Sequence, residues 1–356
     1  MPIGWEQKAR ETGALKRGSN IKTEEELLTL NTLYAANEPS LQQTSVLFKA
    51  TMGISVDKNA VYHRIKASGE WLRWMAQEMC CKNGMSIPKP TFLEKKHVVL
   101  IDASDEPVKG SKKTDYRLHY AFDLFEFQCR TMELTSGKEG EKLPRYEIKS
   151  DDIYVCDRIY CTMSGIEHVL KGGGNFVIRF KSKAFLLYDE AGKKVEILPQ
   201  IRELEAFESK DLRVYYKLST GELRPIRIVA MKKDADAIEK SKRKMNHKVS
   251  KKQEKAVQAD TVELNEYIVL ATSLDYTNAE ILELYRARWQ VEQVFYRLKS
   301  MFGYDDVPSK NADMAQAWFY AKLLLGAICE TLLKKESFFP EWNSAIGTIL
   351  GAKPVD

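Results

Sequence analysis

The stretch at residues 281–302 constrains the fold of this chain more than any other. It contains no Pro or Gly and is rich in strong helix formers, so the sequence predicts one long helix. At about 100° per residue, four polar side chains share an arc of roughly 60° on that helix: Tyr285, Arg288, Glu292 and Lys299. A salt-bridged solvent face is the simpler interpretation, because Arg288 and Glu292 have i,i+4 spacing. One carboxylate beside two cations and a phenol is also a pattern found at functional sites.

Two aspartates follow runs that are typical of buried strands. Residues 98–101 are continuously apolar, and we expect this strand to end at Asp102; residues 153–156 form a second short strand that stops at Asp157. A carboxylate there is costly unless it is paired or binds a cation. Considered singly, each aspartate is more simply an N-cap or turn residue.

Two other aspartates are rivals for the same positions. Asp105 lies beyond the first apolar run, and Asp152 precedes the second strand. Both are therefore weaker candidates for a site at the strand ends.

The spacing Tyr-x2-Arg-x3-Glu-x6-Lys resembles the Tyr-Arg-Glu-Lys signature of the DDE transposases of bacterial insertion sequences, in the group typified by insertion sequence four. The resemblance covers about residues 40–330. The family's acidic triad would fall on Asp102, Asp157 and Glu292, and the run Val-Cys-Asp-Arg-Ile-Tyr resembles its second-aspartate motif. The implied reaction is DNA-mediated transposition: cleavage at transposon ends and strand transfer into target DNA.

The order of elements predicts an α/β chain. Three strands, a connection and a fourth strand match a ribonuclease-H-like catalytic core with a mixed sheet, interrupted by a β-rich insertion and preceded by an α-helical DNA-binding domain. The predicted boundaries are 1–95 for the helical domain, 96–181 for the first part of the core, 182–270 for the insertion with its basic segment, and 271–356 for the second part and the C-terminal helices. The apolar residues 312–334 are expected to pack rather than to span a membrane.

The N-terminal region resembles a helix-turn-helix. Helices are expected at 23–36, 40–51 and 60–67, with Gly53 in the turn. Polar side chains near the exposed side of the last helix are candidates for DNA contacts: Tyr62, His63, Arg64 and Lys66. A plain three-helix bundle is the alternative. Trp71 and Trp74 are expected in the core.

The insertion contains a basic run at residues 239–255 with eight Lys or Arg against two Glu. A solvated helix or loop is one interpretation, and contact with the phosphate backbone is the one we favour, through Lys242, Arg243 and Lys244. Some relatives hold a flipped base with an insertion tryptophan, which this stretch lacks. A stacking role would pass to Phe207, Tyr215 or Tyr216.

Three carboxylates with oxygen-only ligation suit two Mg²⁺ ions, with Mn²⁺ as a substitute. Such ions activate a water or a DNA 3′-hydroxyl and stabilise the leaving oxygen. Arg288 would then bind a DNA phosphate through two N–H groups, and Lys299 would act as a point charge near the cleavage site. Tyr285 would donate a hydrogen bond to the same DNA backbone.

Composition sets wide bounds on the remaining properties. With 44% hydrophobic and 29% charged residues in 356, a large core is expected; the net charge of +5 permits nucleic-acid binding without requiring it. Six scattered cysteines and few histidines favour reduced thiols over structural zinc. No apolar run spans a membrane and no signal peptide is evident, so we expect a cytoplasmic protein. The resemblance to transposases of bacterial insertion sequences implies that it is bacterial and nucleoid-associated. No second domain is evident at the C-terminal end.

The expected partners are double-stranded DNA, as transposon end repeats and target, and a second copy of the chain in a synaptic homodimer. Two alternatives stay open. A catalytically inactive or domesticated DNA-binding regulator would keep the helix-turn-helix and the basic run, and a stand-alone ribonuclease-H-like nuclease would keep the carboxylates.

Overall fold

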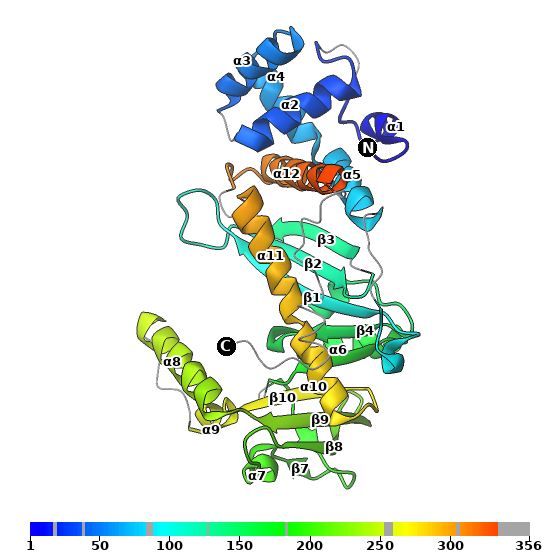
Figure 1. Cartoon of the computed structure of the whole chain (residues 1–356), viewed down its shortest axis with the longest axis vertical. Coiled ribbons are helices and arrows are strands. Elements are labelled where there is room, and N and C mark those ends of the chain that lie inside the picture. The colour runs from blue at the N-terminus through cyan, green and yellow to red at the C-terminus, as the bar shows by residue number, and fades with distance from the viewer. Residues whose placement is uncertain are drawn as a thin grey trace. The chain divides into compact units, whose positions relative to one another are not determined.

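A computed structural model describes residues 1–16, 20–37, 40–82, 88–126, 128–181, 184–252, 259–303 and 307–333 (Figure 1). The chain forms two compact units. The first unit comprises Met1–Pro90, Asp102–Gly140 and Gln290–Asp356, and the second comprises Thr91–Ile101 and Glu141–Trp289. The chain therefore passes from the second unit to the first within strand β1 (Val98–Glu106) and again within helix α11 (Trp289–Phe302).

The first unit begins with helices whose ends are set by local sequence signals. Ser40 and Gln43 form a capping box at the start of α3, Gly53 ends α3 in the left-handed conformation, and the carboxylate of Asp57 caps α4. These helices are α1 (Trp5–Glu11), α2 (Glu24–Asn37), α3 (Leu41–Met52), α4 (Lys58–Ala67) and α5 (Gly69–Lys82). The predicted helical N-terminal region is confirmed, with α2, α3 and α4 packed on one another.

Helix α12 (Ala312–Leu333) is a packing element of the first unit. It lies against α5, α2, α4 and the neighbouring strand β3 (Figure 1). Trp318 and Phe319 on α12 and Trp71 on α5 are fully buried, as large apolar side chains at such an interface should be. Within the described residues, none of the helices combines the length and apolar character that a membrane span requires.

The strands of the first unit are ordered β3-β2-β1. Strands β2 (Tyr116–Asp123) and β3 (Gln128–Ser136) form an antiparallel pair with a bulge at Ala121/Phe122. Strand β1 does not end at Asp102, as the apolar run predicted, but continues to Glu106. The polar residues stay extended because β1 lies beside β2, so tertiary pairing overrides their weak strand propensity.

The sheet of the second unit has the order β1-β4-β5-β10-β9-β8-β6-β7. Strands β1, β4 and β5 are parallel, and β10 reverses the direction beside β5. The further strands are β4 (Ile153–Cys156), β5 (Asn175–Arg179), β6 (Leu187–Tyr188), β7 (Lys194–Val195), β8 (Ser209–Lys217), β9 (Leu223–Lys232) and β10 (Tyr267–Thr272). All four residues of β4 are buried, which matches a parallel strand covered on both faces.

The helices of the second unit are α6 (Met163–Lys171), α7 (Leu198–Ile201), α8 (Ala235–Lys252), α9 (Ala259–Leu264) and α10 (Asn278–Ala287). Helix α10 packs on β4, β5, β8 and β9. The basic run predicted at 239–255 belongs mainly to α8, which projects away from the strands of this unit in Figure 1. Strand β10 starts at Tyr267, shortly after α9 ends at Leu264.

The predicted long helix at 281–302 is divided in two. Helix α10 ends at Ala287 and α11 begins at Trp289, although Arg288 keeps a right-handed helical backbone (φ −53°, ψ −30°). The Arg288 N–H bonds to the Tyr285 carbonyl at 3.1 Å, an i to i−3 bond that tightens the turn. No Pro or Gly marks this position, so the division could not be predicted from the sequence.

Candidate functional site

Asp157 and Tyr285 are brought together in the second unit. Asp157 follows β4 directly, as predicted, and accepts a hydrogen bond from the Tyr285 hydroxyl at 3.3 Å. It precedes a short 3₁₀ turn but makes no side-chain cap bond there, so the N-cap interpretation does not explain it. Burial raises the pKa of Tyr285, which keeps its phenol a hydrogen-bond donor.

Arg288 lies over the ring of Tyr285. The guanidinium carbon is 5.8 Å from the ring centroid, which is within cation–π range. Both residues line an open cavity of about 220 Å³ together with Trp289. Trp289 is 55% exposed, which is unusual for so large an apolar ring. Trp289 could not be singled out from its position in the sequence, because a tryptophan on a helix is most simply a core residue.

Three cations that the sequence analysis did not assign surround this part of the second unit. Desolvation and the charge of Arg179 lower the pKa of Arg158, which follows Asp157 in the chain. Desolvation and the charges of Arg179 and Arg158 lower the pKa of Lys233 to about 8. Positive charges close together in a partly desolvated region destabilise the folded protein, and a bound anion would offset their repulsion. We call Arg158, Arg179 and Lys233 the cation cluster.

In the first unit, Asp102 and Glu292 are both accessible to solvent. Asp102 is half-buried and accepts a hydrogen bond from the Ala103 N–H at 2.9 Å; Glu292 is exposed in the first turn of α11. The rival Asp105 is one of the exposed residues of β1 and pairs with Arg117 at 2.9 Å. Since alternate residues of a strand face opposite sides, Asp105 does not share the face of Asp102.

Lys299 is partly exposed, and its ammonium group contacts β1. Its ammonium group lies 3.4 Å from the Glu106 carboxylate and donates to the Asp105 carbonyl at 3.2 Å. Glu106 is 1% exposed, at the end of β1. Lys299 therefore joins α11 to β1 within the first unit, a role that its spacing in the sequence did not suggest.

The predicted metal ligands fit Mg²⁺ or another hard divalent ion by the chemistry of their donors. All three are carboxylates, the oxygen donors that hard divalent ions prefer. Asp102 and Glu292 belong to the first unit and Asp157 to the second. In the part of the chain that the structure describes, no group of three or more His, Cys, Asp or Glu residues is gathered as a ready-made metal site.

The four predicted DNA-contact residues of α4 differ in accessibility. His63 is exposed, and Tyr62 and Arg64 are half-buried, with the rings of Tyr62 and His63 in edge contact at 5.4 Å. Lys66 pairs with Asp313 of α12 at 3.3 Å. The face of α4 that could meet a ligand therefore contains His63 and Arg64, while Lys66 is engaged in packing α4 on α12.

The predicted basic residues of α8 are partly engaged in ion pairs. Lys242 pairs with Glu266 at 2.8 Å, and Arg243 pairs with Glu239 one turn earlier. The side chain of Lys244 lies outside the described residues. The exposed ion pair between Arg243 and Glu239 contributes little stability, so a phosphate could replace Glu239 as the partner of Arg243.

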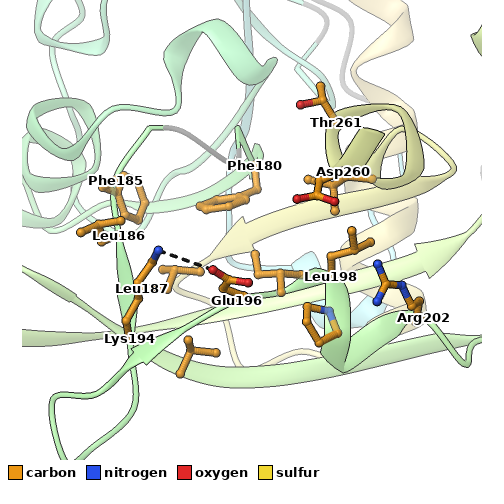
Figure 2. Close-up of a pocket in the computed structure, with 14 residues that line it drawn as sticks. Phe180, Phe185, Leu186, Leu187, Lys194, Glu196, Leu198, Arg202, Asp260 and Thr261 are labelled. Carbon is orange, nitrogen blue, oxygen red and sulfur yellow. Dashed lines mark hydrogen bonds and ion pairs between the residues drawn. The ribbon is translucent and has the colours of Figure 1, made fainter. Parts of the chain in front are cut away.

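The insertion contains a larger open cavity of about 750 Å³ (Figure 2). Phe180, Phe185 and Leu186 form much of its apolar wall. Two of its charged side chains are paired with a cation or anion, Lys194 with Glu196 at 3.5 Å and Arg202 with Glu263 at 2.6 Å. None of the predicted site residues lines it. The cavity therefore gives no support for a catalytic role.

The predicted stacking residues of the insertion are not equivalent. Tyr216 is fully buried and its hydroxyl bonds to Glu167, so its ring cannot receive a base. Phe207 is 62% exposed and is the accessible member of the set. Tyr215 is half-buried on β8.

The mixed sheet with helices fits the ribonuclease-H-like core of an α/β DNA-processing enzyme. Residues 93–326 match the family described as Transposase DDE domain. The chain belongs to this family of DDE transposases. It is a transposase, an enzyme that cleaves DNA and transfers strands.

Similarity to individual transposases extends over almost the whole chain. The chain is 24% identical over 348 residues to InsL of insertion sequence element IS186A from Escherichia coli (strain K12), covering 93% of this chain and 91% of the relative. It is 24% identical over 349 residues to the transposase of insertion sequence element IS421 from Escherichia coli, with the same coverage. The transposase of insertion sequence element IS1151 from Clostridium perfringens is 24% identical over 201 residues, or 51% of this chain and 42% of that protein.

Proposed function

We propose that this transposase belongs to the group typified by insertion sequence four and that Tyr285, Arg288, Glu292 and Lys299 are its Tyr-Arg-Glu-Lys signature. Asp102, Asp157 and Glu292 would be its catalytic carboxylates. The observation that carries the proposal is the hydrogen bond from Tyr285 to Asp157, because it joins a signature residue to the aspartate that follows β4. A solvated helix face would have no reason to make that contact.

The same three carboxylates would hold two Mg²⁺ ions, with Mn²⁺ as a substitute. Bound to these oxygens, the ions would activate a water or a DNA 3′-hydroxyl and stabilise the leaving oxygen. The Tyr285 hydroxyl would orient the Asp157 carboxylate by donating to one oxygen and leaving the other for a metal ion.

The cation cluster would bind the phosphate backbone next to the cleavage site. Desolvation and the charge of Arg179 lower the pKa of Arg158, and desolvation and the charges of both arginines lower the pKa of Lys233, so a phosphate that approaches them gains charge-assisted hydrogen bonds and removes a repulsion. Arg288 would fork onto the same backbone. The exposed ring of Trp289 offers a surface on which a base can stack.

The helical region at 1–95 would recognise the transposon end repeats. In a helix-turn-helix the second helix enters the major groove, and α4 would present His63 and Arg64 there, with Tyr62 at the edge of the contact. Lys66 would support α4 through Asp313 rather than contact a base. Lys242, Arg243 and Lys244 in the insertion, predicted at 182–270, would contact phosphates further along the DNA.

Transposition joins two element ends, so a synaptic complex would contain a homodimer bound to both ends and to target DNA. The substrate implies a cytoplasmic enzyme that works on the nucleoid. The predicted core segments, 96–181 and 271–356, would supply the carboxylates of each active site.

The proposal is tested by cleavage of a DNA duplex that ends in the element's inverted repeats. The wild type should nick this duplex in Mg²⁺ and not in EDTA, and Glu292→Gln should bind the duplex but not nick it. Nicking by Glu292→Gln at the wild-type rate would remove Glu292 from the active site. Recovery of strand-transfer products with pre-nicked ends distinguishes a transposase of this type from a nuclease.

A further inference from the structure

Glu106 is a buried carboxylate that no part of the proposed reaction uses. It is 1% exposed at the end of β1, and its partner is Lys299 of α11, at 3.4 Å. A carboxylate buried to this extent is stable only when it is paired or hydrogen-bonded. The pair therefore ties one end of α11 to the end of β1.

We propose that Glu106 and Lys299 form a strut that sets the position of Glu292 relative to Asp102, so that Lys299 acts on the metal site through Glu106 rather than by contact with DNA. Both are then positioning residues. The inference rests on the proposed function, because it takes Asp102 and Glu292 as metal ligands.

The face of α11 that meets the sheet supports this role. Glu292, Phe295 and Lys299 have i, i+3 and i+7 spacing and so lie on one face of the helix. Phe295 packs against Tyr120 of β2, with ring centroids 5.8 Å apart, and Lys299 reaches β1. Glu292 therefore lies on the face of α11 that is turned toward the strands of the first unit.

The corresponding face of β1 contains Asp102. Asp102, Ser104 and Glu106 alternate along the strand, so all three point to the same side. Ser104 and Glu106 are buried there, and Asp102 is half-buried. The strut residue and the proposed ligand thus share one face of β1, as Lys299 and Glu292 share one face of α11.

The distance from the proposed ligand to the strut residue is similar along β1 and along α11. Four residues of strand separate Asp102 from Glu106, about 13 Å. Seven residues of helix separate Glu292 from Lys299, about 10 Å. Lys299 contacts Glu106. If the two elements run in the same direction, Glu292 on α11 therefore lies at about the same position along β1 as Asp102.

A second connection joins the segments that follow the two elements. Val108, just after β1, and Val307, just after α11, form a parallel bridge. The Lys109 N–H donates to the Val307 carbonyl at 3.0 Å, and the Val307 N–H donates to the Pro107 carbonyl at 3.2 Å. The C-terminal ends of β1 and α11 are therefore held together by the bridge and by the strut.

The two possible roles of Lys299 predict different measurements. A DNA contact affects the affinity for DNA and its dependence on salt. A strut affects the affinity for the metal ion, even without DNA, because it sets the separation of two ligands. Outer-shell partners of metal ligands typically change metal affinity by roughly 10- to 100-fold.

The test compares the wild type with Glu106→Gln, Lys299→Met and the double variant. Mn²⁺ binding to the full-length protein is measured by electron paramagnetic resonance without DNA, and the affinity for a repeat-end duplex is measured by fluorescence anisotropy at several salt concentrations. Each single variant should weaken Mn²⁺ binding by about 10- to 100-fold. The double variant should bind no more weakly than the weaker single one, and the affinity for DNA should change less than about twofold.

Glu24→Gln is the matched control. Glu24 is also a buried carboxylate of the first unit paired with a cation, Arg10 at 2.7 Å, but it lies on α2. The Glu24→Gln protein should bind Mn²⁺ with the affinity of the wild type. Lys299 is 33% exposed at its side chain, so Lys299→Met tests the strut even if Glu106→Gln fails to fold.

Two results would overturn the strut. One is a Glu106→Gln protein with the Mn²⁺ affinity of the wild type. The other is a Lys299→Met protein that keeps this affinity but binds DNA more weakly with a smaller salt dependence. If Glu292→Gln binds Mn²⁺ as tightly as the wild type, the proposed metal site itself is wrong, which is a separate result.

Discussion

Lys233 is held near two guanidinium groups, and the energetic cost of that position is measurable. Desolvation and the charges of Arg179 and Arg158 lower its pKa from 10.5 to about 8. Its ammonium group donates to the Asn265 carbonyl at 2.6 Å and to the Ser241 hydroxyl at 3.1 Å, which holds it in place. The protein thus keeps a repulsive charge where the proposed substrate would bring phosphate.

The stability of the DNA-free protein should therefore depend on pH through Lys233. The unfolded chain binds the proton up to about pH 10.5 and the folded chain only to about pH 8, so the free energy of unfolding rises with pH between these values. The difference in melting temperature between the wild type and Lys233→Met should shift in favour of the wild type from pH 7.5 to pH 10. An equal difference at both pH values would show that Lys233 has an ordinary pKa.

Tyr285 allows a test of one hydroxyl group. Tyr285→Phe keeps the ring under Arg288 but removes the hydrogen bond to Asp157. A hydrogen bond to a charged group contributes about 1.5–3 kcal/mol, so nicking should slow by roughly 10- to 150-fold. Tyr188→Phe, on β6 away from the signature, is the control and should nick at the wild-type rate. A Tyr285→Phe protein with unchanged nicking would mean that this hydroxyl does not support Asp157.

At the scale of single elements, the start of α10 is set by a capping box. The Thr277 hydroxyl accepts from the Glu280 N–H, and the Glu280 carboxylate accepts from the Thr277 N–H. Thr277→Ala should lower the free energy of unfolding by about 1 kcal/mol, measured by urea denaturation. Thr277→Ser keeps the hydroxyl and should retain most of that stability. Equal midpoints for Thr277→Ala and the wild type would show that tertiary packing alone holds α10.

Most strands were predictable from the sequence because they are apolar runs bounded by turn residues. The run at residues 153–156 predicted β4 and the position of Asp157 after it. The continuation of β1 through Asp102 to Glu106 was not predictable, because five mostly polar residues carry no strand signal. Those residues remain extended through their neighbour β2, which lies later in the chain.

The site was predictable only where residue spacing within one helix determines which side chains meet. Helical spacing put Tyr285 and Arg288 on one face, and the structure has them in contact. Arg179 and Lys233 could not be found in this way, because Arg179 is the last residue of β5, Lys233 follows β9, and the two meet only through the strand order of the sheet. The engagement of Lys299 with Glu106 likewise depends on the packing of α11 on β1.

At the scale of the whole molecule, the proposed site residues are divided between two units. The first unit contains Asp102, Glu292 and the Glu106–Lys299 pair, and the second contains Asp157, Tyr285 and the cation cluster. In the proposed reaction the first unit contributes two metal ligands, and the second contributes one ligand and most of the phosphate contacts.

The central claim is the proposed assignment of Asp102, Asp157 and Glu292 as metal ligands. It is tested most directly by Mn²⁺ titration of the full-length protein on a repeat-end duplex, followed by electron paramagnetic resonance, for the wild type, Asp102→Asn and Asp157→Asn. We predict that each substitution alone weakens Mn²⁺ binding at least about tenfold, because each removes a ligand. Asp157→Asn protein that binds Mn²⁺ with the affinity and stoichiometry of the wild type would contradict the claim.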